Sequence, residues 1–331
     1  MKKPNIALLT GGFSAEANIS ELSAVKVFEW IDKQKYEVYL IHITPEKWFY
    51  KDKINEYIID KNDFSLLISN KKIKFDLAVF FPLHGPPAED GKIQAYFDLI
   101  EVPYTGCNML SSAITFNKHA CKTYIDNTGV AMAKSIICNK QNGVEISIKN
   151  IENSLKLPVF VKPNKNGSSY GVSKVKEKDK LNEALLKSFK YDDEVIVEEY
   201  IVGREFSCGV YQLNGETIAL PPTEIISQTE FFDYEAKYLG KSREVTPADL
   251  TLSQTQEIQK WAINIFKAVA CSTLSRIDFI LNNEIFYFLE VNTTPGMTNE
   301  SIVPQQVRAA GLKVDEFINN LIEEKLRERT I

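Results

Sequence analysis

One stretch near the C-terminal end, residues 275–292, constrains the fold more than any other part of the sequence. It reads SRIDFILNNEIFYFLEVN, two strand-like runs rich in Ile, Phe, Tyr and Val that flank Asn282 and Asn283. Short runs of this composition on either side of a turn-forming pair predict an antiparallel hairpin. The chain must therefore contain a two-stranded antiparallel unit with its turn at these two asparagines.

Four polar residues of this stretch are spaced so that they can share one face of the hairpin. Arg276 and Asp278 lie two apart on the first strand, and Glu290 and Asn292 lie two apart on the second. Side chains two apart point to the same side of a strand. The two pairs share a face if the loop has an odd number of residues, for example 282–284, because a one-residue slip turns a strand's side chains to the other side.

On a shared face, two carboxylates, an amide oxygen and a guanidinium would converge. Oxygen ligands of this kind suit Mg²⁺ that carries nucleotide phosphates. The alternative is an edge hairpin whose polar side chains face water. The residue pattern leaves both interpretations open.

The N-terminal third of the sequence alternates strand-like and helical patterns. Apolar runs predict strands, and apolar residues at helical spacing predict a helix between the first two of them. These elements are expected, in chain order, at residues 5–10, 20–31, 36–44 and 75–81. The alternation predicts a small doubly wound α/β domain, with function at the carboxyl ends of its strands. Gly11, Gly12, His84 and Gly85 follow such ends.

The rest of the chain, from Asn117 onward, has an α+β pattern. Strands are expected at 158–161, 195–200, 205–212 and 217–220, and helices at 178–189 and 253–270. The tail, residues 314–329, reads as a charged amphipathic helix whose Phe317, Leu321 and Leu326 should pack on the body of the protein. No internal repeat is present.

Composition excludes several classes of protein. The 331 residues include 39 basic and 44 acidic side chains, a net charge of −5, and they contain no basic block. Binding to nucleic acid or to an anionic membrane needs such a block, so neither partner is expected. The apolar run at residues 6–9 is too short for a signal peptide, and no run reaches membrane-spanning length, which predicts a cytoplasmic protein.

The cysteines and histidines give little sign of metal or redox chemistry. Five cysteines without a CxxC pair read as reduced core residues. No His/Cys spacing fits a zinc site. His84, one of three histidines, follows an apolar strand and precedes Gly85, which favours a functional role, although a lone histidine is more often structural.

Two segments could hold a nucleotide. Lys162 ends a predicted strand and begins a Gly/Ser-rich loop, residues 162–171, whose backbone N–H groups could cover phosphate oxygens. The loop does not have the Walker A order, and a plain turn is the alternative. The segment 198–205 offers a backbone for an adenine edge and a carboxylate for a ribose, unless its acidic residues are merely solvated.

Two further segments could act on a substrate. The aromatic loop 231–238 could close over a site, or it could be an ordinary surface loop. Residues 292–298 lead to Ser301 at the start of a predicted helix, where free N–H groups favour a carboxylate or an oxyanion. Ser301 as a simple helix cap is the competing interpretation.

Taken together and in this order, these segments resemble the ATP-grasp enzymes and, within them, the D-alanine:D-alanine ligase family. The likeness covers nearly the whole chain. It is carried by GGFSAE at 11–16, HG at 84–85, EDG at 89–91, YTG at 104–106, KP at 162–163 and EVNTTPGMT at 290–298. Relatives usually have glycine at the position of Ala88, which here follows Pro86 and Pro87.

The resemblance implies a fold that is part α/β and part α+β. A doubly wound, Rossmann-like N-terminal domain, of the kind that precedes ATP-grasp folds, would occupy residues 1–117. A two-part ATP-grasp fold would follow, with a central subdomain at 118–202. A C-terminal subdomain at 203–331 would hold the metal and second-substrate sites.

The resemblance also implies roles for individual residues. The residues implied for ATP are Lys118, Lys162, Ser168 and Ser169 at the phosphates, Lys237 at the γ-phosphate, Glu198, Glu199 and Ile201 along the adenine, and Glu205 at the ribose. Those implied for two Mg²⁺ ions, with Mn²⁺ as a possible substitute, are Asp278, Glu290 and Asn292. Those implied for the substrates are Glu16 at the amino group of the first D-alanine, linked through Ser168 to Tyr238, His84 beside that molecule, Arg276 and the Gly296 N–H at the transition state, and Ser301 at the carboxylate of the second D-alanine.

The implied activity is ATP-dependent formation of D-alanyl-D-alanine through an acyl phosphate, for peptidoglycan precursors. One alternative is a ligase that takes D-lactate or D-serine second, against which Tyr238 argues by resemblance. Another is an ATP-binding regulator without catalysis. The resemblance also implies a homodimer.

Overall fold

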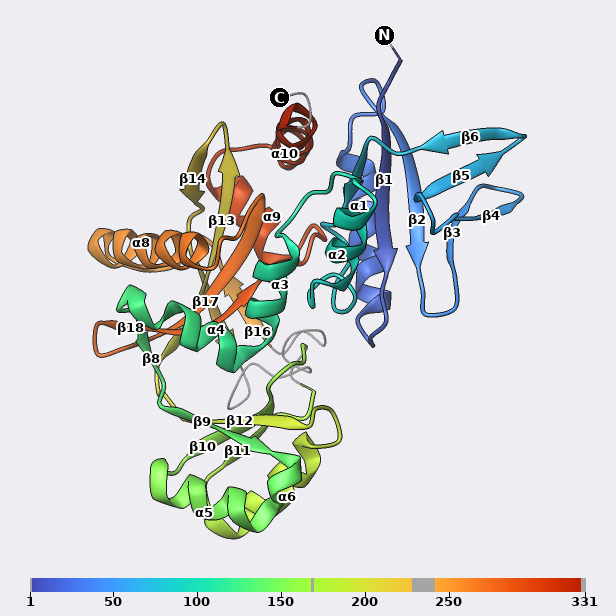
Figure 1. Ribbon diagram of the computed structural model, residues 1–331. Coiled ribbons are helices and arrows are strands. Elements are labelled where there is room, and N and C mark those ends of the chain that lie inside the picture. The colour runs from blue at the N-terminus through green and yellow to red at the C-terminus, as the bar shows by residue number, and fades with distance from the viewer. Residues whose placement is uncertain (1, 168–169, 228–241, 329–331) are drawn as a thin grey trace.

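The computed structural model describes residues 2–167, 170–227 and 242–328. Over these residues the chain forms a five-stranded, a four-stranded and a seven-stranded sheet, together with one small hairpin (Figure 1). Mixed sheets with helices agree with the predicted α/β and α+β fold. The predicted domain boundaries 1–117, 118–202 and 203–331 stay a prediction.

The N-terminal region contains the five-stranded sheet, in the order β4-β3-β2-β1-β7. Its strands are β1 (Asn5–Gly11), β2 (Glu37–Ile43), β3 (Trp48–Lys51), β4 (Glu56–Ile58) and β7 (Leu77–Val79), and its helices are α1 (Ala17–Trp30) and α2 (Lys92–Leu99). β1 pairs in parallel with β2 and β7, whereas β3 and β4 extend the edge in antiparallel fashion.

Both faces of this sheet are covered by helices. Ile6 and Leu8 of β1 belong to one buried cluster with residues of α1, whereas Ala7 and Leu9 belong to another with residues of α2. A strand buried on both faces has apolar residues at nearly every position, as this one has. The doubly wound arrangement predicted for this region is confirmed.

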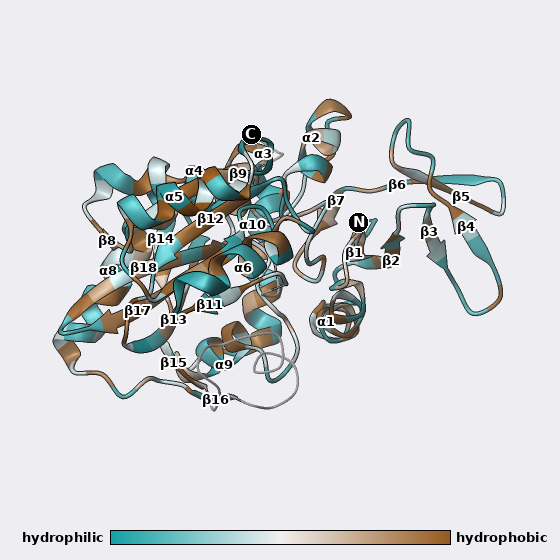
Figure 2. Cartoon of the chain, turned by 90° about the horizontal axis from the view of Figure 1, so that it is seen from below, coloured by the Kyte–Doolittle hydropathy of each residue, from teal (hydrophilic) through white to brown (hydrophobic). Residues whose placement is uncertain are grey.

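The sequence patterns did not predict the edge strands β3 and β4 or the separate hairpin of β5 (Ser65–Ile68) and β6 (Lys71–Lys74). These strands are three or four residues long. Both views show them on the side of the N-terminal sheet that faces away from the rest of the chain (Figure 2). Runs this short carry too few alternations to be distinguished from turns.

The four-stranded sheet lies below the others in Figure 1 and has the order β11-β10-β12-β9. Its elements are β9 (Ser135–Asn139), β10 (Val159–Pro163), β11 (Ser173–Val175), β12 (Glu194–Glu199), α5 (Val144–Ser154) and α6 (Leu181–Ser188). Val159 and Val161 pack in one cluster with the two helices, which cover one face. Because side chains alternate, Lys162 and Glu198 lie on the opposite face.

The seven-stranded sheet has the order β16-β15-β13-β17-β18-β8, with β14 paired to β13. Its strands are β8 (Ala131–Met132), β13 (Arg204–Leu213), β14 (Glu216–Ala219), β15 (Thr223–Ser227), β16 (Ser242–Val245), β17 (Leu274–Asn282) and β18 (Ile285–Asn292). The associated helices are α3 (Met109–Phe116), α4 (Lys118–Ile125), α8 (Leu252–Ala268) and α9 (Ile302–Ala309), and short 3₁₀ turns occupy Asp126–Thr128, Lys140–Asn142 and Lys178–Lys180. Cys121 and Ile125 of α4 pack in the core beneath α8.

The predicted hairpin is present as β17 and β18, but its turn differs from the prediction. Only Asn283 and Glu284 separate the paired residues Asn282 and Ile285, and both turn residues have left-handed φ angles, 47° and 65°. The expected loop of odd length is therefore wrong. A two-residue turn with both central residues at positive φ matches the twist of paired strands.

A β-bulge restores the predicted common face. Asn282 pairs with Ile285, whereas Asp278 pairs with Glu290 and Arg276 with Asn292, so β18 contains one extra residue between the two registers. The buried positions of β18 shift by one residue across the bulge. Phe286 and Phe288 are buried before it, and Val291 is buried after it. The four polar side chains therefore share a face, as predicted.

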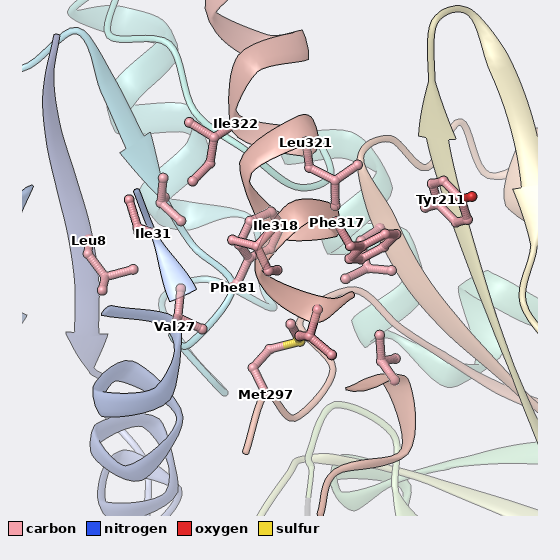
Figure 3. Close-up of a cluster of buried hydrophobic side chains, with 14 of the residues drawn as sticks. Leu8, Val27, Ile31, Phe81, Tyr211, Met297, Phe317, Ile318, Leu321 and Ile322 are labelled. Carbon is pink, nitrogen blue, oxygen red and sulfur yellow. The ribbon is translucent and has the colours of Figure 1, made fainter. Parts of the chain in front are cut away.

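The C-terminal helix α10 (Val314–Glu328) joins the N-terminal sheet to the seven-stranded sheet. In Figure 3, Ile318 and Ile322 lie toward α1, and Phe317 lies toward Tyr211 of β13, with the two rings 4.9 Å apart. Phe317 and Leu321 are buried and Leu326 packs against the same cluster. The predicted docking of the tail is confirmed.

Two composition-based expectations concern the cysteines and membranes. All five cysteines are free and buried, as predicted. Among the described residues, no helix combines the length and the apolar character needed to cross a membrane.

Candidate active site

A cavity of about 360 Å³ lies where the N-terminal sheet, α9 and the β17–β18 hairpin meet. It brings together predicted site residues from widely separated parts of the sequence. Those that line it are Glu16, His84, Lys118, Arg276, Glu290, Asn292, Gly296 and Ser301. The loops after parallel strands and the hairpin thus form one site.

Two glycines allow the loops after β1 and β7 to meet at this cavity. Gly12 has a φ of +117°, and a Cβ there would lie 2.9 Å from the carbonyl oxygen of His84. Gly85 has a φ of +69°, and a Cβ there would lie 2.9 Å from Oε2 of Glu16. Only glycine satisfies both the positive φ and the close approach.

The turn that differs from the family pattern is fully packed. Ala88 is buried, its N–H donates to the carbonyl oxygen of Gly85 at 3.0 Å, and its carbonyl oxygen accepts from Nε2 of Gln94 at 2.7 Å. The carbonyl oxygen of Pro86 accepts from the N–H of Phe13 at 2.7 Å. The alanine therefore leaves the loop in contact with the segment that carries Glu16.

His84 connects three segments and is buried. Nδ1 lies 2.8 Å from the carbonyl oxygen of Thr294, and Nε2 lies 3.0 Å from Oγ of Ser23. Because a carbonyl only accepts, Nδ1 carries the proton and Nε2 accepts from the Ser23 hydroxyl. Burial lowers the pKa of His84, so the ring is neutral. The side chain therefore orients the loop of Thr294 while it also lines the cavity.

Two carboxylates lie close to His84, at what we call the first end of the cavity. Oε1 of Glu89 accepts from Oγ1 of Thr294 at 2.8 Å. Burial, followed by the nearby charge of Glu16, raises the pKa of Glu89 to about 7. A Cβ on Gly167 would lie 3.1 Å from Oε2 of Glu16, so the Gly/Ser-rich loop reaches this end. This end is suited to a positively charged group of a ligand.

Arg276 and Asp278 form a bidentate ion pair. Nε and one terminal nitrogen of Arg276 donate to the two carboxylate oxygens at 2.9 and 2.8 Å, and the Ser207 hydroxyl also donates to Asp278. Burial alone would lower the pKa of Arg276, but the charges of Asp278 and Glu290 raise it, so the guanidinium stays charged. A fixed guanidinium facing the cavity can stabilise developing negative charge.

The hairpin offers only oxygen donors to a metal ion. Within the described ranges, no group of three or more His, Cys, Asp or Glu side chains is close enough to enclose an ion. The donor set is instead two carboxylates and the amide of Asn292, whose Oδ1 accepts from the N–H of Thr294 at 3.1 Å. Mg²⁺ usually keeps waters and substrate phosphates beside one or two protein carboxylates, so this set fits it.

A buried cluster of charges lies on the open face of the four-stranded sheet. Glu198 forms ion pairs with Lys162 and with Lys122, the latter at 2.6 Å, and Nζ of Lys122 also donates to the carbonyl oxygen of Ala133 at 2.6 Å. Burial alone would raise the pKa of Glu198, but the two lysines lower it to about 2. The charge of Glu290 on the hairpin, after that of Glu198, helps to raise the pKa of Lys162 against the effect of burial.

The other residues predicted to bind ATP lie in several different places. Nζ of Lys118 donates to the carbonyl oxygen of Asn166 at 2.7 Å, next to the Gly/Ser-rich loop. Glu199 points to the opposite side of β12 from Glu198 and accepts from the N–H of Lys156 at 3.0 Å, so its carboxylate is turned away from the cluster. Ile201 follows β12, and Glu205 lies on the same face of the seven-stranded sheet as Asp278. Outside the described residues lie Ser168, Ser169, Lys237, Tyr238 and the rest of the loop 231–238.

Ser301 occupies the N-cap position of α9 but does not cap the helix with its side chain. Its Oγ lies 3.0 Å from the N–H of Thr298 and 2.8 Å from Oγ1 of Thr298. A Cβ on Gly296 would lie 2.9 Å from the same Oγ. The simple-cap interpretation does not describe this residue, and its hydroxyl lies at the helix start together with Gly296.

Several residues of the site were not predicted from the sequence. Lys122 could have been found, since it lies one helical turn after Lys118 and such residues share a face. Thr294 and Glu89 lie inside the motifs EVNTTPGMT and EDG, which carry the resemblance, but no role was predicted for either residue. Glu244, which also lines the cavity, had no signal, because a single acidic residue in a short strand is usually solvated.

The Glu198 carboxylate should make stability depend on pH. Its pKa falls from 4.5 to about 2 on folding, so its contribution is complete above about pH 4.5 and is lost as the pH falls toward 2. We expect the free energy of unfolding, measured by urea titration between roughly pH 5 and pH 3, to fall more steeply for the wild type than for Glu198→Gln. Glu199→Gln serves as the control and should keep the wild-type slope. Equal slopes for the wild type and Glu198→Gln would contradict the prediction.

Two family models match the chain. One, described as "D-ala D-ala ligase N-terminus", matches residues 5–107, and the other, "D-ala D-ala ligase C-terminus", matches residues 124–323. A D-alanine--D-alanine ligase of Flavobacterium johnsoniae is 44% identical over 320 residues, which span 96% of this chain and 98% of that protein.

Solved structures are similar over the full length. The VanG D-Ala:D-Ser ligase from Enterococcus faecalis superimposes with a TM-score of 0.89 at 34% identity, covering 98% of this chain and 100% of that chain. A D-alanine--D-alanine ligase from Bacillus anthracis complexed with ATP gives a TM-score of 0.76 at 29% identity, covering 99% and 98%.

Proposed function

The chain belongs to the D-alanine:D-alanine ligase family, and on that premise we propose that it joins two D-alanine molecules with ATP and releases D-alanyl-D-alanine, ADP and phosphate. One observation carries the proposal. The hairpin face that bears Arg276, Glu290 and Asn292 lines the same cavity as Glu16 and Ser301. Groups suited to phosphates, to an ammonium and to a carboxylate thus meet in one place.

The nucleotide would lie between the four-stranded sheet and the hairpin. Lys162 and Lys118 supply positive charge for its phosphates, together with the loop of Ser168 and Ser169. Lys162 and Lys122 both pair with Glu198, so that carboxylate would keep a cationic partner when Lys162 contacts a phosphate. Glu198 and the backbone of the segment that follows it can then accept hydrogen bonds from the adenine.

Asp278, Glu290 and Asn292 would hold Mg²⁺. When bound, the ion would neutralise the phosphate charge that opposes attack by a carboxylate. Lys162 would add positive charge there, and the resemblance implies that Lys237, which lies outside the described residues, acts at the γ-phosphate. Arg276 orients Asp278 through its bidentate pair, so the ligand is fixed before the ion arrives.

The first half of the reaction activates a carboxylate. Glu16 and the neutral His84 would position the first D-alanine, whose carboxylate oxygen attacks the γ-phosphorus of ATP. The resemblance implies that Glu16 is linked through Ser168 to Tyr238. ADP leaves, and the product is an acyl phosphate. This step depends mostly on position and on charge neutralisation.

The second half forms the peptide bond. Ser301 and the start of α9 would bind the carboxylate of the second D-alanine, whose amine attacks the acyl carbon. The oxyanion that forms is stabilised by Arg276 and by the N–H of Gly296, and inorganic phosphate then leaves. D-Alanyl-D-alanine is the unit that peptidoglycan precursors require, which places the reaction in cell-wall synthesis and, with ATP as substrate, in the cytoplasm.

The test is phosphate release from ATP and Mg²⁺ with D-alanine alone, with L-alanine, and with D-alanine plus D-lactate or D-serine, with products identified by mass. We expect release that depends on D-alanine, with the dipeptide as product. No product with any substrate, while ATP still binds, would favour a regulator without catalysis.

A D-alanine:D-serine ligase is the second candidate. The solved VanG D-Ala:D-Ser ligase is 34% identical to this chain, less than the 44% of the Flavobacterium johnsoniae D-alanine--D-alanine ligase. The D-serine arm of the assay decides between them, because a mixed dipeptide formed in preference to D-alanyl-D-alanine would support the second candidate.

We also propose a homodimer formed through α1. Leu22, Val25 and Phe28 lie three residues apart on this helix and are 60%, 52% and 36% exposed. An apolar stripe on an exposed helix favours burial against a partner. Sedimentation equilibrium should give about twice the chain mass of 37.6 kDa, and Val25→Glu should give the monomer. A wild-type monomer at micromolar concentration would contradict the proposal.

A further inference from the structure

We propose that Glu244 binds the amino group of the second D-alanine and makes the site prefer an amine over a hydroxy acid. The inference rests on the proposed function, in which Ser301 binds the carboxylate of the same molecule. A D-amino acid is a zwitterion. Its tight binding therefore needs a carboxylate for the ammonium, placed beside the donors for the carboxylate.

The strand register places Glu244 on the catalytic face of the seven-stranded sheet. Glu244 of β16 pairs with Ile225 of β15, which pairs with Glu205 of β13. Ser207, two residues after Glu205, pairs with Asp278. Directly paired residues, and residues two apart on a strand, point to the same side. Glu244 and Asp278 therefore share a face, although two strands, β15 and β13, lie between theirs in the sheet.

Helix α9 holds Glu244 close to Ser301. Nε2 of Gln305 donates to Oε2 of Glu244 at 2.6 Å. Gln305 lies four residues after Ser301, about one turn or ~6 Å along the helix axis. The next residue, Gln306, fastens α9 to β13 by accepting from the N–H of Gly209 at 3.0 Å and donating to the carbonyl oxygen of Ser207 at 2.9 Å.

Near Ser301, at what we call the second end of the cavity, Glu244 is a carboxylate that is held in place by a hydrogen bond from Gln305. It is half-buried and lines the cavity together with Ser301. Glu300, the other carboxylate there, is exposed. Glu16 and Glu89 lie at the first end, beside His84. Among the described residues that line the second end, Glu244 is therefore the acidic side chain whose position is set by the fold.

Glu244 lines the same cavity as Arg276, the guanidinium at the reaction centre. The charge of Glu244 helps to raise the pKa of Arg276 against the effect of burial, after the charges of Asp278 and Glu290. An ammonium bound to Glu244 would thus lie between the group that stabilises the oxyanion and the group that holds the substrate carboxylate. Its nitrogen would then be directed toward the acyl carbon once it loses a proton.

This arrangement discriminates between an amine and an alcohol. An ammonium forms a charge-assisted hydrogen bond with a carboxylate, which is about twice as strong as a bond between neutral groups. The hydroxyl of D-lactate carries no charge and gains less from Glu244. Removal of the charge should therefore weaken the binding of D-alanine in the second position more than that of D-lactate.

The experiment compares the wild type with Glu244→Gln, which can still accept from Gln305. D-Alanine fills both positions, so the rate is fitted with one Michaelis constant for each. We expect the KM for the second D-alanine to rise about tenfold or more, with the KM values for ATP and the first D-alanine within about twofold. In competition, the ratio of dipeptide to D-alanyl-D-lactate should fall about tenfold.

Two controls keep the outcome decisive. Glu300→Gln removes the same charge from the same end at an exposed side chain and should change the second KM less than about threefold. The thermal midpoint of Glu244→Gln checks the fold, and Glu244→Asp should restore part of the preference. An unchanged second KM and an unchanged product ratio in folded Glu244→Gln would overturn the inference. Absence of dipeptide formation by the wild type would instead refute the proposed function.

Discussion

Replacement of Arg276 by alanine should lower kcat by about a thousandfold while ATP binding changes less than about threefold. Removal of one preorganised donor to a developing oxyanion typically costs a factor of 10² to 10³, and Arg276 also orients the Asp278 carboxylate through two hydrogen bonds, at 2.9 and 2.8 Å. In the proposed function, the nucleotide is held mainly by lysines on other elements. Steady-state phosphate release gives kcat, and calorimetric titration with ATP gives the affinity.

Two variants serve as controls for Arg276. Arg276→Lys keeps a charge but cannot form the bidentate pair, so we expect intermediate activity. Arg243→Ala removes an exposed arginine from the opposite face of β16 and should leave kcat unchanged. Wild-type turnover in Arg276→Ala would exclude the assigned role. A parallel loss of ATP binding would mean that the residue acts on the nucleotide instead.

Glu290→Gln should lower activity at least a hundredfold at millimolar Mg²⁺ and raise the Mg²⁺ concentration needed for half-maximal rate. The substitution removes one of the two carboxylates that face each other across the hairpin, Asp278 and Glu290, and Mg²⁺ depends on anionic oxygen ligands. The measurement is phosphate release at increasing Mg²⁺, with Mn²⁺ as a second ion. Chelation of the metal in the wild type should abolish release, and added Mg²⁺ should restore it.

Glu284→Gln is the matched control, because Glu284 lies in the exposed turn of the same hairpin. The substitution removes the same charge as Glu290→Gln. Its Mg²⁺ dependence should equal that of the wild type. If Glu290→Gln showed the wild-type Mg²⁺ dependence, Glu290 would not be a metal ligand. A thermal unfolding curve for each variant separates metal binding from stability.

The hairpin shows which structural features a local sequence pattern can predict. Spacing by two placed Arg276 with Asp278 and Glu290 with Asn292, and both strands and their common face are present. The turn length was wrong because the sequence was treated as an uninterrupted alternation. The signal of the bulge was in the sequence, where the apolar positions change from Phe286 and Phe288 to Val291.

The positions of charged side chains were harder to predict. Glu198 and Glu199 are neighbours of the same chemical type, yet one is buried between two lysines and the other is turned away from them. Alternation says that they face opposite sides, but which side is covered depends on where α5 and α6 pack. The position of Lys122 also depends on tertiary packing, since its partner Glu198 lies 76 residues away in the sequence.

By itself, the sequence determined many of the helices and strands and the order of the motifs, because apolar periodicity, glycines at strand ends and a turn flanked by β-formers act over a few residues. The tertiary structure alone decided which of these motifs meet. Glu16, His84, Arg276 and Ser301 line one cavity because the N-terminal region packs against the seven-stranded sheet, through α10 and through contacts such as that of His84 with Thr294. Glu244 gains a proposed role in the same way, through a hydrogen bond to Gln305 on α9. Such contacts between distant segments depend on burial and on the packing of whole elements, which no local window of sequence contains.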